Sequence, residues 1–99
     1  MIYKIVNRPL VTSDILNAVD FYKEINPKLA HQFLLRIKEA IDYIEKSPFS
    51  FQIKYNQVRT VLLKQFPYQI HYLVDEERNT VVILAIIHSY RNPDDFTKR

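Results

Sequence analysis

The chain has 99 residues, 47% hydrophobic and 25% charged, which predicts a single globular domain over residues 1–99 and excludes a disordered chain. It has no cysteine and no glycine, which excludes disulfides, thiolate chemistry and glycine-rich phosphate loops. The net charge of +3 is compatible with an acidic partner or with nucleic acid. Because there is neither a membrane-span-length apolar run nor a signal-peptide core, we expect a cytoplasmic protein without membrane contact.

The first predicted elements are a short strand from Ile2 to Val6 and a helix capped by Thr12 or Ser13. Apolar residues recur in this helix at helical spacing, namely Ile15, Ala18, Val19, Tyr22 and Ile25. Two further residues widen the apolar stripe beyond half of the circumference, Leu16 and Phe21. We therefore expect the helix to contact a second helix and either the sheet or a partner protein.

A second helix is predicted from Pro27 to about Lys46. Asn26 can cap it, and proline suits the first helical position because its missing N–H would be unpaired there. Its apolar stripe is continuous and comprises Leu29, Ala30, Phe33, Leu34, Ile37, Ala40, Ile41 and Ile44. Leu35 is isolated on the polar side. With almost no linker between them, the two helices should form an antiparallel hairpin.

Four strands are predicted after Ser47-Pro48: Phe51 to Tyr55, Val58 to Phe66, Tyr68 to Asp75, and Val81 to His88. Their short polar connections indicate an antiparallel meander. The fold class is therefore α+β, with a short N-terminal strand and an α-helical hairpin packed on an antiparallel β-meander. Without glycine, turns that need positive φ must use residues such as Asn7, Asn56 and Asn79. A polar tail is expected over about 92–99.

Alternation along the strands predicts which side chains face the core. The face with Tyr68, Ile70, Tyr72 and Val74 is predicted to be core, and the face with Gln69, His71 and Leu73 to be the other side. Arg59 would lie across a strand from Gln69 and His71 if it projects onto their face. The last strand is apolar on both faces until His88, which is typical of a central strand.

Two places carry residues that suit catalysis. Arg59 can bind a phosphate bidentately, although an ion pair within the sheet or a contact with a partner protein would also explain it. His88, Tyr90 and Arg91 supply the base, acid and positive charge that RNA cleavage through a 2′-hydroxyl needs. They would equally serve to end a buried strand. His71 is a weaker candidate, and His31 is expected on the solvated surface. We expect no cofactor and no metal.

Several blocks in this order resemble the RelE/ParE toxins of bacterial type II toxin–antitoxin modules. They are the Arg-x-x-Leu-Leu-Lys-x-Phe-Pro-Tyr block from Arg59, the Ile-x-Tyr strand from Ile70, and the His-x-x-Arg-x-Pro end from His88. An upstream block from Asp20 to Phe33 extends the resemblance to nearly the whole chain. The resemblance implies a growth-inhibiting toxin, of the kind found in plasmid stabilisation, that a cognate antitoxin neutralises.

The resemblance leaves three functions open. Ribosome-dependent mRNA endonucleases of the family would use Arg59 for the scissile phosphate, together with His88, Tyr90 and Arg91. ParE-like members bind DNA gyrase instead, and the scattered Lys and Arg residues of this chain favour that branch. A degenerate toxin would bind only its antitoxin. In each case the apolar excess at Leu16, Phe21 and Leu35 is the expected antitoxin-binding surface.

Overall fold

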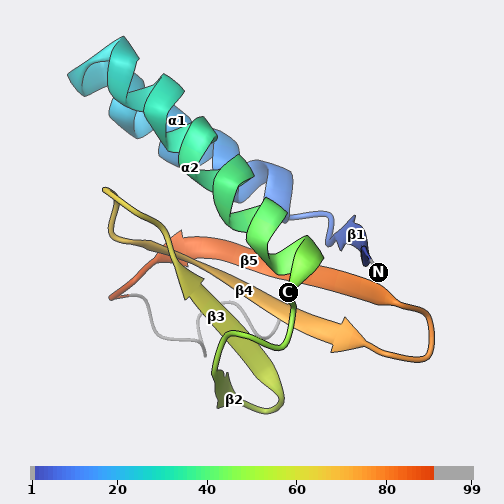
Figure 1. Cartoon of the computed structure of the whole chain (residues 1–99). Coiled ribbons are helices and arrows are strands. Elements are labelled where there is room, and N and C mark those ends of the chain that lie inside the picture. Colours follow the sequence, from blue (N-terminus) through green and yellow to red (C-terminus); the bar gives the residue numbers. More distant parts are fainter. Residues whose placement is uncertain (1, 91–99) are drawn as a thin grey trace.

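The computed structural model describes residues 2–90, which form two helices packed on one face of a five-stranded sheet (Figure 1). In chain order the elements are β1 (Lys4–Asn7), α1 (Val11–Ile25), α2 (Pro27–Lys46), β2 (Ile53–Tyr55), β3 (Val58–Leu62), β4 (Tyr68–Asp75) and β5 (Thr80–His88). The predicted α+β class and helical hairpin are confirmed. Residue 1 and the predicted tail lie outside the described residues.

The strand order is β1-β5-β4-β3-β2, and strands β2 to β5 form the predicted antiparallel meander. β1 pairs with β5 in parallel, so the sheet is mixed, and β5 lies between β1 and β4 as a central strand should. β1 begins at Lys4 rather than at the predicted Ile2. The reason is that the N–H of Tyr3 bonds to the carbonyl of Glu45 on α2, while the N–H of Lys4 bonds to the carbonyl of Asn79.

The predicted cap of α1 at Thr12 or Ser13 is wrong. The helix begins at Val11, after Leu10, and no side chain caps it. Val11 is almost fully buried, so placing its side chain in the core fixes the first turn in the absence of a cap. Asp14 in this first turn has another role, because its Oδ2 accepts a hydrogen bond from the N–H of Ile86 on β5 at 3.0 Å.

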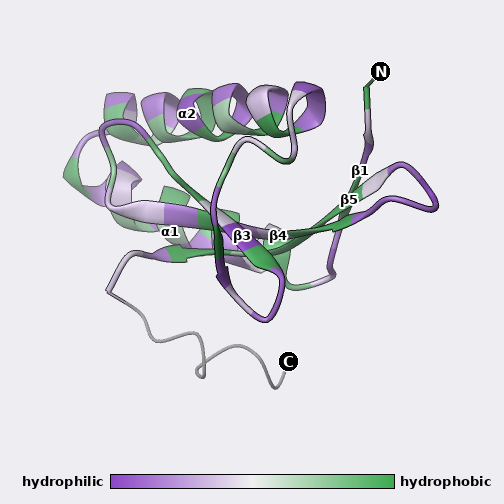
Figure 2. Ribbon diagram, turned by 60° about the horizontal axis from the view of Figure 1, so that its bottom comes forward, coloured by the Kyte–Doolittle hydropathy of each residue, from purple (hydrophilic) through white to green (hydrophobic). Residues whose placement is uncertain are grey.

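α2 has the predicted bounds and cap, since Asn26 Oδ1 accepts from the N–H of Lys28 at 2.9 Å. Hydrophobic and hydrophilic residues alternate in bands along it (Figure 2). Its apolar stripe packs on the predicted core face of β4 in one cluster, except for Leu34, which is 45% exposed. The fully enclosed large side chains of the cluster are Tyr72, Phe33, Ile44, Ile70, Ile83, Ile86, Val11 and Val81. The core assignment of Tyr68, Ile70, Tyr72 and Val74 is confirmed.

Two strands are shorter than predicted. β2 begins at Ile53 rather than Phe51, because the Phe51 carbonyl accepts a hydrogen bond from the Arg59 side chain. β3 ends at Leu62 rather than Phe66. Beyond it, Gln65 has a left-handed backbone and Phe66 folds into the core, which turns the chain back into β4.

Left-handed backbone occurs at Asn56 and Asn79, as predicted, and also at Gln57 and Gln65. The prediction for Asn7 is wrong, because Asn7 lies in extended β1 opposite Ile83. In the part of the chain that is described, no helix combines the length and apolarity that crossing a membrane requires.

Candidate functional site

A chain of touching aromatic rings runs from the core to the surface at the end of β5. We call this group the aromatic ladder; its members are Phe33, Phe66, Tyr22, Phe21, Tyr68, His88 and Tyr90. Phe33 at its inner end is completely buried, whereas Tyr90 at its outer end is 91% exposed. Most of these contacts are edge-to-face, whereas the outermost one, between His88 and Tyr90, is tilted, so the exposed ring rests on a well-packed base.

His88 sits where β4 begins and β5 ends. It lies opposite Tyr68 in the sheet, with ring centroids 5.5 Å apart, and its other neighbour is the Tyr90 ring at 5.2 Å. The N–H of Tyr90 donates to His88 Nδ1 at 3.3 Å, so a neutral ring carries its proton on Nε2. The N–H of Ser89 bonds to the carbonyl of Pro67 at 2.8 Å, which ties this segment to the loop before β4.

The inner tyrosines of the ladder are held in the neutral form. Burial raises the pKa of Tyr22, and the charge of a neighbouring Tyr68 phenolate would raise it further. Burial also raises the pKa of Tyr68. Both phenols are therefore neutral packing groups near neutral pH, and neither serves as a base. Both tyrosines lie on predicted apolar faces and were not predicted to belong to the site, although Phe66 and Tyr68 on either side of Pro67 are an aromatic signal in the sequence.

Arg59 lies on the face opposite to that of Gln69 and His71. It pairs with Tyr72 across β3 and β4, whereas Thr60 pairs with His71, so Arg59 shares the helix-covered face. The condition under which Arg59 would lie beside Gln69 and His71 is therefore not met, because a shift of one residue in register reverses every face.

The Arg59 guanidinium is engaged by the loop that precedes β2. Its Nη1 donates to the carbonyl of Phe51 at 2.6 Å and to that of Phe49 at 3.4 Å, and its carbon lies 5.1 Å from the centre of the Phe49 ring. Next to it, the Tyr72 hydroxyl donates to the carbonyl of Pro48 at 2.6 Å. Arg59 and Tyr72 together hold the loop against the end of the sheet.

The two predicted catalytic groups are far apart. Arg59 lies opposite Tyr72, and His88 lies opposite Tyr68, four residues away along β4. Four residues along a strand and two strand spacings across the sheet correspond to a Cα separation on the order of 15 Å. The structure brings His88 and Tyr90 together but not Arg59, and Arg91 lies outside the described residues.

His71 is on the sheet face that the helices do not cover, and it is buried. The Tyr55 hydroxyl lies 3.1 Å from His71 Nδ1, and a small apolar cluster of Ala85 and Ile87 packs against Tyr55. Burial raises the pKa of Tyr55. Nearby, Lys54 Nζ donates to Gln69 Oε1 at 3.5 Å.

His31 is exposed, as expected. No grouping of His and acidic residues that could hold a metal ion occurs within residues 2–90.

The residues predicted to bind an antitoxin are all exposed: Leu16 56%, Phe21 56% and Leu35 52%. They do not form one patch. Leu16 and Phe21 are five positions apart on α1, which places them about 140° apart around the helix axis. Phe21 joins the aromatic ladder through Tyr22, with ring centroids 5.1 Å apart. Their role in antitoxin binding stays a prediction.

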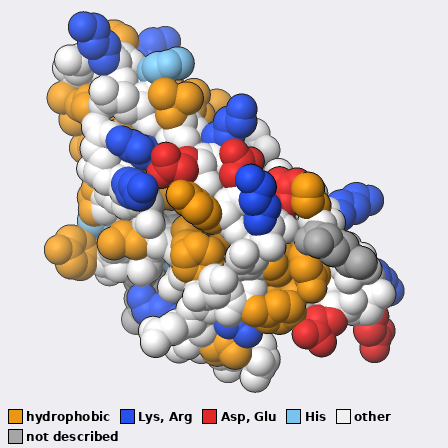
Figure 3. Space-filling view, viewed as in Figure 1, with side chains coloured by type: hydrophobic (Ala, Val, Ile, Leu, Met, Phe, Trp, Pro, Cys, Tyr) orange, Lys and Arg blue, Asp and Glu red, His pale blue; other side chains and the backbone are white. Residues whose placement is uncertain are grey.

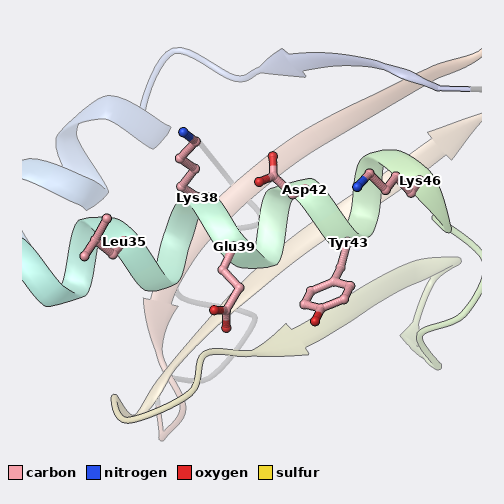
Figure 4. A pocket seen from close by; sticks show the side chains of 6 residues that line it. All are labelled: Leu35, Lys38, Glu39, Asp42, Tyr43 and Lys46. Carbon is pink, nitrogen blue, oxygen red and sulfur yellow. The ribbon is translucent and has the colours of Figure 1, made fainter.

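Leu35 lies on the outer surface of α2, at a shallow hollow of about 400 Å³ (Figure 4). The hollow is otherwise lined by charged residues and a tyrosine, namely Lys38, Glu39, Asp42, Tyr43 and Lys46. In the close-up view Glu39 and Tyr43 point towards β3, whereas Lys38 and Asp42 point the other way. The surface around Leu35 is therefore mixed in character rather than continuously apolar.

Comparisons with solved structures show the same fold in toxins. The chain is similar to a chromosomal ParDE toxin–antitoxin system from P. aeruginosa, with a TM-score of 0.74, 19% identity, and coverage of 88% of this chain and 96% of that one. It is also similar to the RelBE2 complex of Mycobacterium tuberculosis, with a TM-score of 0.58, 16% identity, and coverage of 89% of this chain and 99% of that one. For the isolated E. coli RelE toxin the TM-score is 0.62 at 12% identity, with coverage of 94% and 90%.

No curated protein matches the chain by sequence. A family model described as the ParE toxin of the type II toxin–antitoxin system parDE matches residues 5–93, which is most of the sequence. The resemblance found in the sequence is therefore confirmed, together with the ParE-like branch. The chain belongs to the ParE toxin family of type II toxin–antitoxin systems.

Proposed function

We propose that this toxin inhibits growth by binding DNA gyrase and that it does not cleave RNA. The observation that carries the proposal is the state of Arg59. Its guanidinium is bonded to the carbonyls of Phe49 and Phe51 and lies far from His88. An arginine engaged in this way supports the loop before β2 and is not poised to bind a scissile phosphate.

Cleavage of RNA needs a base, an acid and positive charge around one phosphate. Of the predicted groups in the described region, only His88 and Tyr90 are neighbours. The ion pairs in that region place their Lys and Arg groups elsewhere, on Glu39 and Asp75. The scattered positive charge is also poorly suited to gripping mRNA, for which several contacts must act together.

A binding function fits the exposed end of the aromatic ladder better. Tyr90 and Phe21 present large exposed rings, and Ile25 near the end of α1 is 61% exposed. Aromatic side chains are enriched at protein–protein interfaces because they bury a large area with little loss of conformational entropy. We therefore propose the outer rings of the ladder as part of the gyrase-binding surface. This activity would take place in the cytoplasm.

The ribonuclease alternative has one observation in its favour. His88 and Tyr90 are in contact, and the next residue in the sequence is Arg91. If Arg91 supplied the positive charge, these three residues would make a site without Arg59. A degenerate toxin that binds only its antitoxin is the third alternative, and the same experiment separates all three.

The test measures gyrase supercoiling and cleavage of ribosome-bound mRNA with the same purified toxin. We expect supercoiling to be inhibited and the mRNA to stay intact. Tyr90→Ala should weaken the inhibition, whereas Tyr43→Ala, which removes a 57% exposed tyrosine from α2, should not. Codon-positioned cuts that decrease in His88→Gln, with a changed pH profile, would establish the ribonuclease instead. A protein inactive in both assays that still binds its antitoxin would be the degenerate toxin.

A further inference from the structure

Two strands of the sheet are paired along only part of one side. β1 pairs with Thr80–Ile83 of β5 and does not extend along the rest of that strand. β2 pairs with Val58 and Arg59 of β3, and residues 60–62 extend beyond it. Unpaired strand edges carry backbone groups that a partner strand can bind, so the protein must either block such an edge or use it.

The β5 edge is blocked by a side chain. The N–H of Ile86 points out of the sheet edge and donates to Asp14 Oδ2 on α1 at 3.0 Å. The carboxylate thus occupies the position where the carbonyl of an added strand would bind. Because Asp14 belongs to a helix packed on the core, displacing it would disturb the first turn of α1.

The β3 edge has no such block within residues 2–90. The N–H of Leu63 bonds to the carbonyl of Tyr68 at 2.9 Å and so faces β4. Because these directions alternate along a strand, the N–H and carbonyl of Leu62 face away from β4, towards the open side. The side chain of Leu62 is 62% exposed. Leu62 therefore presents one donor and one acceptor to an approaching chain.

A pocket of about 250 Å³ opens beside this edge, between β3 and α2. Its lining residues are Arg36, Glu39, Ala40, Tyr43, Phe51, Val61, Leu62 and Lys64. Ala40, Val61 and Phe51 contribute an apolar floor, continuous with the core. The space-filling view shows hydrophobic side chains emerging next to basic and acidic ones along the junction of helices and sheet (Figure 3).

The rim of the pocket carries an excess of positive charge. Arg36 Nη1 lies 3.3 Å from Glu39 Oε2, and Lys64 Nζ lies 3.6 Å from Glu39 Oε1. Two cations thus share one carboxylate, and the Lys64 side chain is 68% exposed. A carboxylate from a partner would complete this group with favourable charge.

We propose that an extended segment of the cognate antitoxin adds to the sheet at Leu62 of β3. One apolar residue of that segment would fill the pocket over Val61, and an acidic residue two positions away would meet Arg36 and Lys64. The spacing follows from the strand, in which side chains two residues apart share a face. The proposal rests on the toxin–antitoxin partnership and is independent of the cellular target. It commits to the antitoxin because this family is paired with one, and because the rim and the chain as a whole are positively charged.

The test uses the toxin coexpressed and copurified with the antitoxin encoded next to it. Amide hydrogen exchange is compared between the complex and the refolded free toxin. We expect slower exchange at the N–H of Leu62 in the complex, and little change at Ile86, whose N–H is already bonded to Asp14. Unchanged exchange at Leu62 in a stable complex would overturn the strand addition while leaving gyrase inhibition untouched.

Two variants at one position sharpen the result. Leu62→Pro removes the outward N–H, at an edge position where proline is tolerated, and should weaken antitoxin binding by about tenfold or more. Leu62→Ala keeps the N–H and should weaken it by less than about threefold. Equal affinities of Leu62→Pro and wild type would contradict the proposal. If Leu62→Pro fails to fold, Lys64→Glu gives the second arm, and wild-type affinity of that variant would exclude the charge contact.

Discussion

The two ends of the sheet's helix-covered face are built differently. At one end Arg59 and Tyr72 use their polar atoms on backbone carbonyls of the loop before β2. At the other end Tyr68, His88 and Tyr90 are joined by ring contacts, and the last ring is almost fully exposed. The first end is closed in the sense that Arg59 Nη1 and the Tyr72 hydroxyl already have backbone acceptors, although Arg59 also lines a hollow of about 700 Å³. The second is open and leaves the Tyr90 ring exposed to solvent.

This difference separates residues that support the fold from residues that are free to act. Arginine, tyrosine and histidine are all typical of active sites. The sequence has Arg59 and Tyr72 at one end and His88 and Tyr90 at the other, so residue type alone does not separate the two ends. Only the geometry shows that the Arg59 guanidinium already has acceptors. Two results would contradict this difference: a variant without Arg59 that keeps full stability, or a variant without the outer rings of the ladder that loses stability.

The largest effect is expected where the ladder enters the core. Phe33→Ala removes a completely buried ring that contacts Tyr22, Phe66 and Tyr68. It should lower the free energy of unfolding by about 3–5 kcal/mol in urea denaturation, because a cavity is left in the core. The matched control is Leu35→Ala, which removes a 52% exposed side chain and should cost less than about 0.5 kcal/mol.

A smaller loss is expected at the closed end. Arg59→Ala removes the charged donor of the Phe49 and Phe51 carbonyls and should cost about 1–3 kcal/mol in the same measurement. Lys54→Ala on the neighbouring strand β2, where the side chain is exposed, is the control and should be nearly neutral. An Arg59→Ala protein with wild-type stability and no toxicity would show that Arg59 acts on the target, which would reverse the comparison.

Tyr72→Phe tests the other tether at the closed end. It leaves the buried Pro48 carbonyl without its donor and should cost about 1–2 kcal/mol. Burial raises the Tyr72 pKa from 10.0 to about 12, although the nearby Arg59 charge opposes the shift. Since the folded-state pKa is the higher one, the stabilisation is full below pH 10 and is lost as pH rises towards 12.

Unfolding curves at several pH values check this pH dependence. The decline of stability between pH 10 and 12 should be shallower in Tyr72→Phe than in wild type. Some decline remains in the variant, because burial also raises the pKa of Tyr22, Tyr55 and Tyr68. Parallel declines in the two proteins would mean that the Tyr72 hydroxyl is reached by solvent.

The smallest effect on stability is expected at the outer part of the ladder. Phe21→Asp replaces a 56% exposed ring and should change the free energy of unfolding by less than about 0.5 kcal/mol. It should still weaken the complex with the antitoxin, as measured by titration calorimetry, because a charge replaces an apolar contact. Unfolding of this variant would show that Phe21 belongs to the core.

Local signals in the sequence were enough for much of the fold. The bounds of α2 follow from the Asn26-Pro27 start, the apolar stripe and the Ser47-Pro48 stop, and all of these act within a few residues. The core face of β4 and the central position of β5 follow from alternation and from two-sided hydrophobicity. The left-handed turns at Asn56 and Asn79 reflect the absence of glycine, which leaves asparagine as the best remaining residue.

The site depended on contacts between distant parts of the chain. The face of Arg59 was decided by the register between β3 and β4, and the short β2 by the hydrogen bond from Arg59 to Phe51. The start of α1 was decided by the burial of Val11. Asp14 accepts the edge N–H of Ile86 on β5, 72 residues away in the chain. Periodicity and capping preferences are properties of neighbouring residues, so the sequence alone determines which segments are helices and strands. Register, edge blocking and the use of each polar side chain depend on which atoms meet across the fold, and only the tertiary structure decides them.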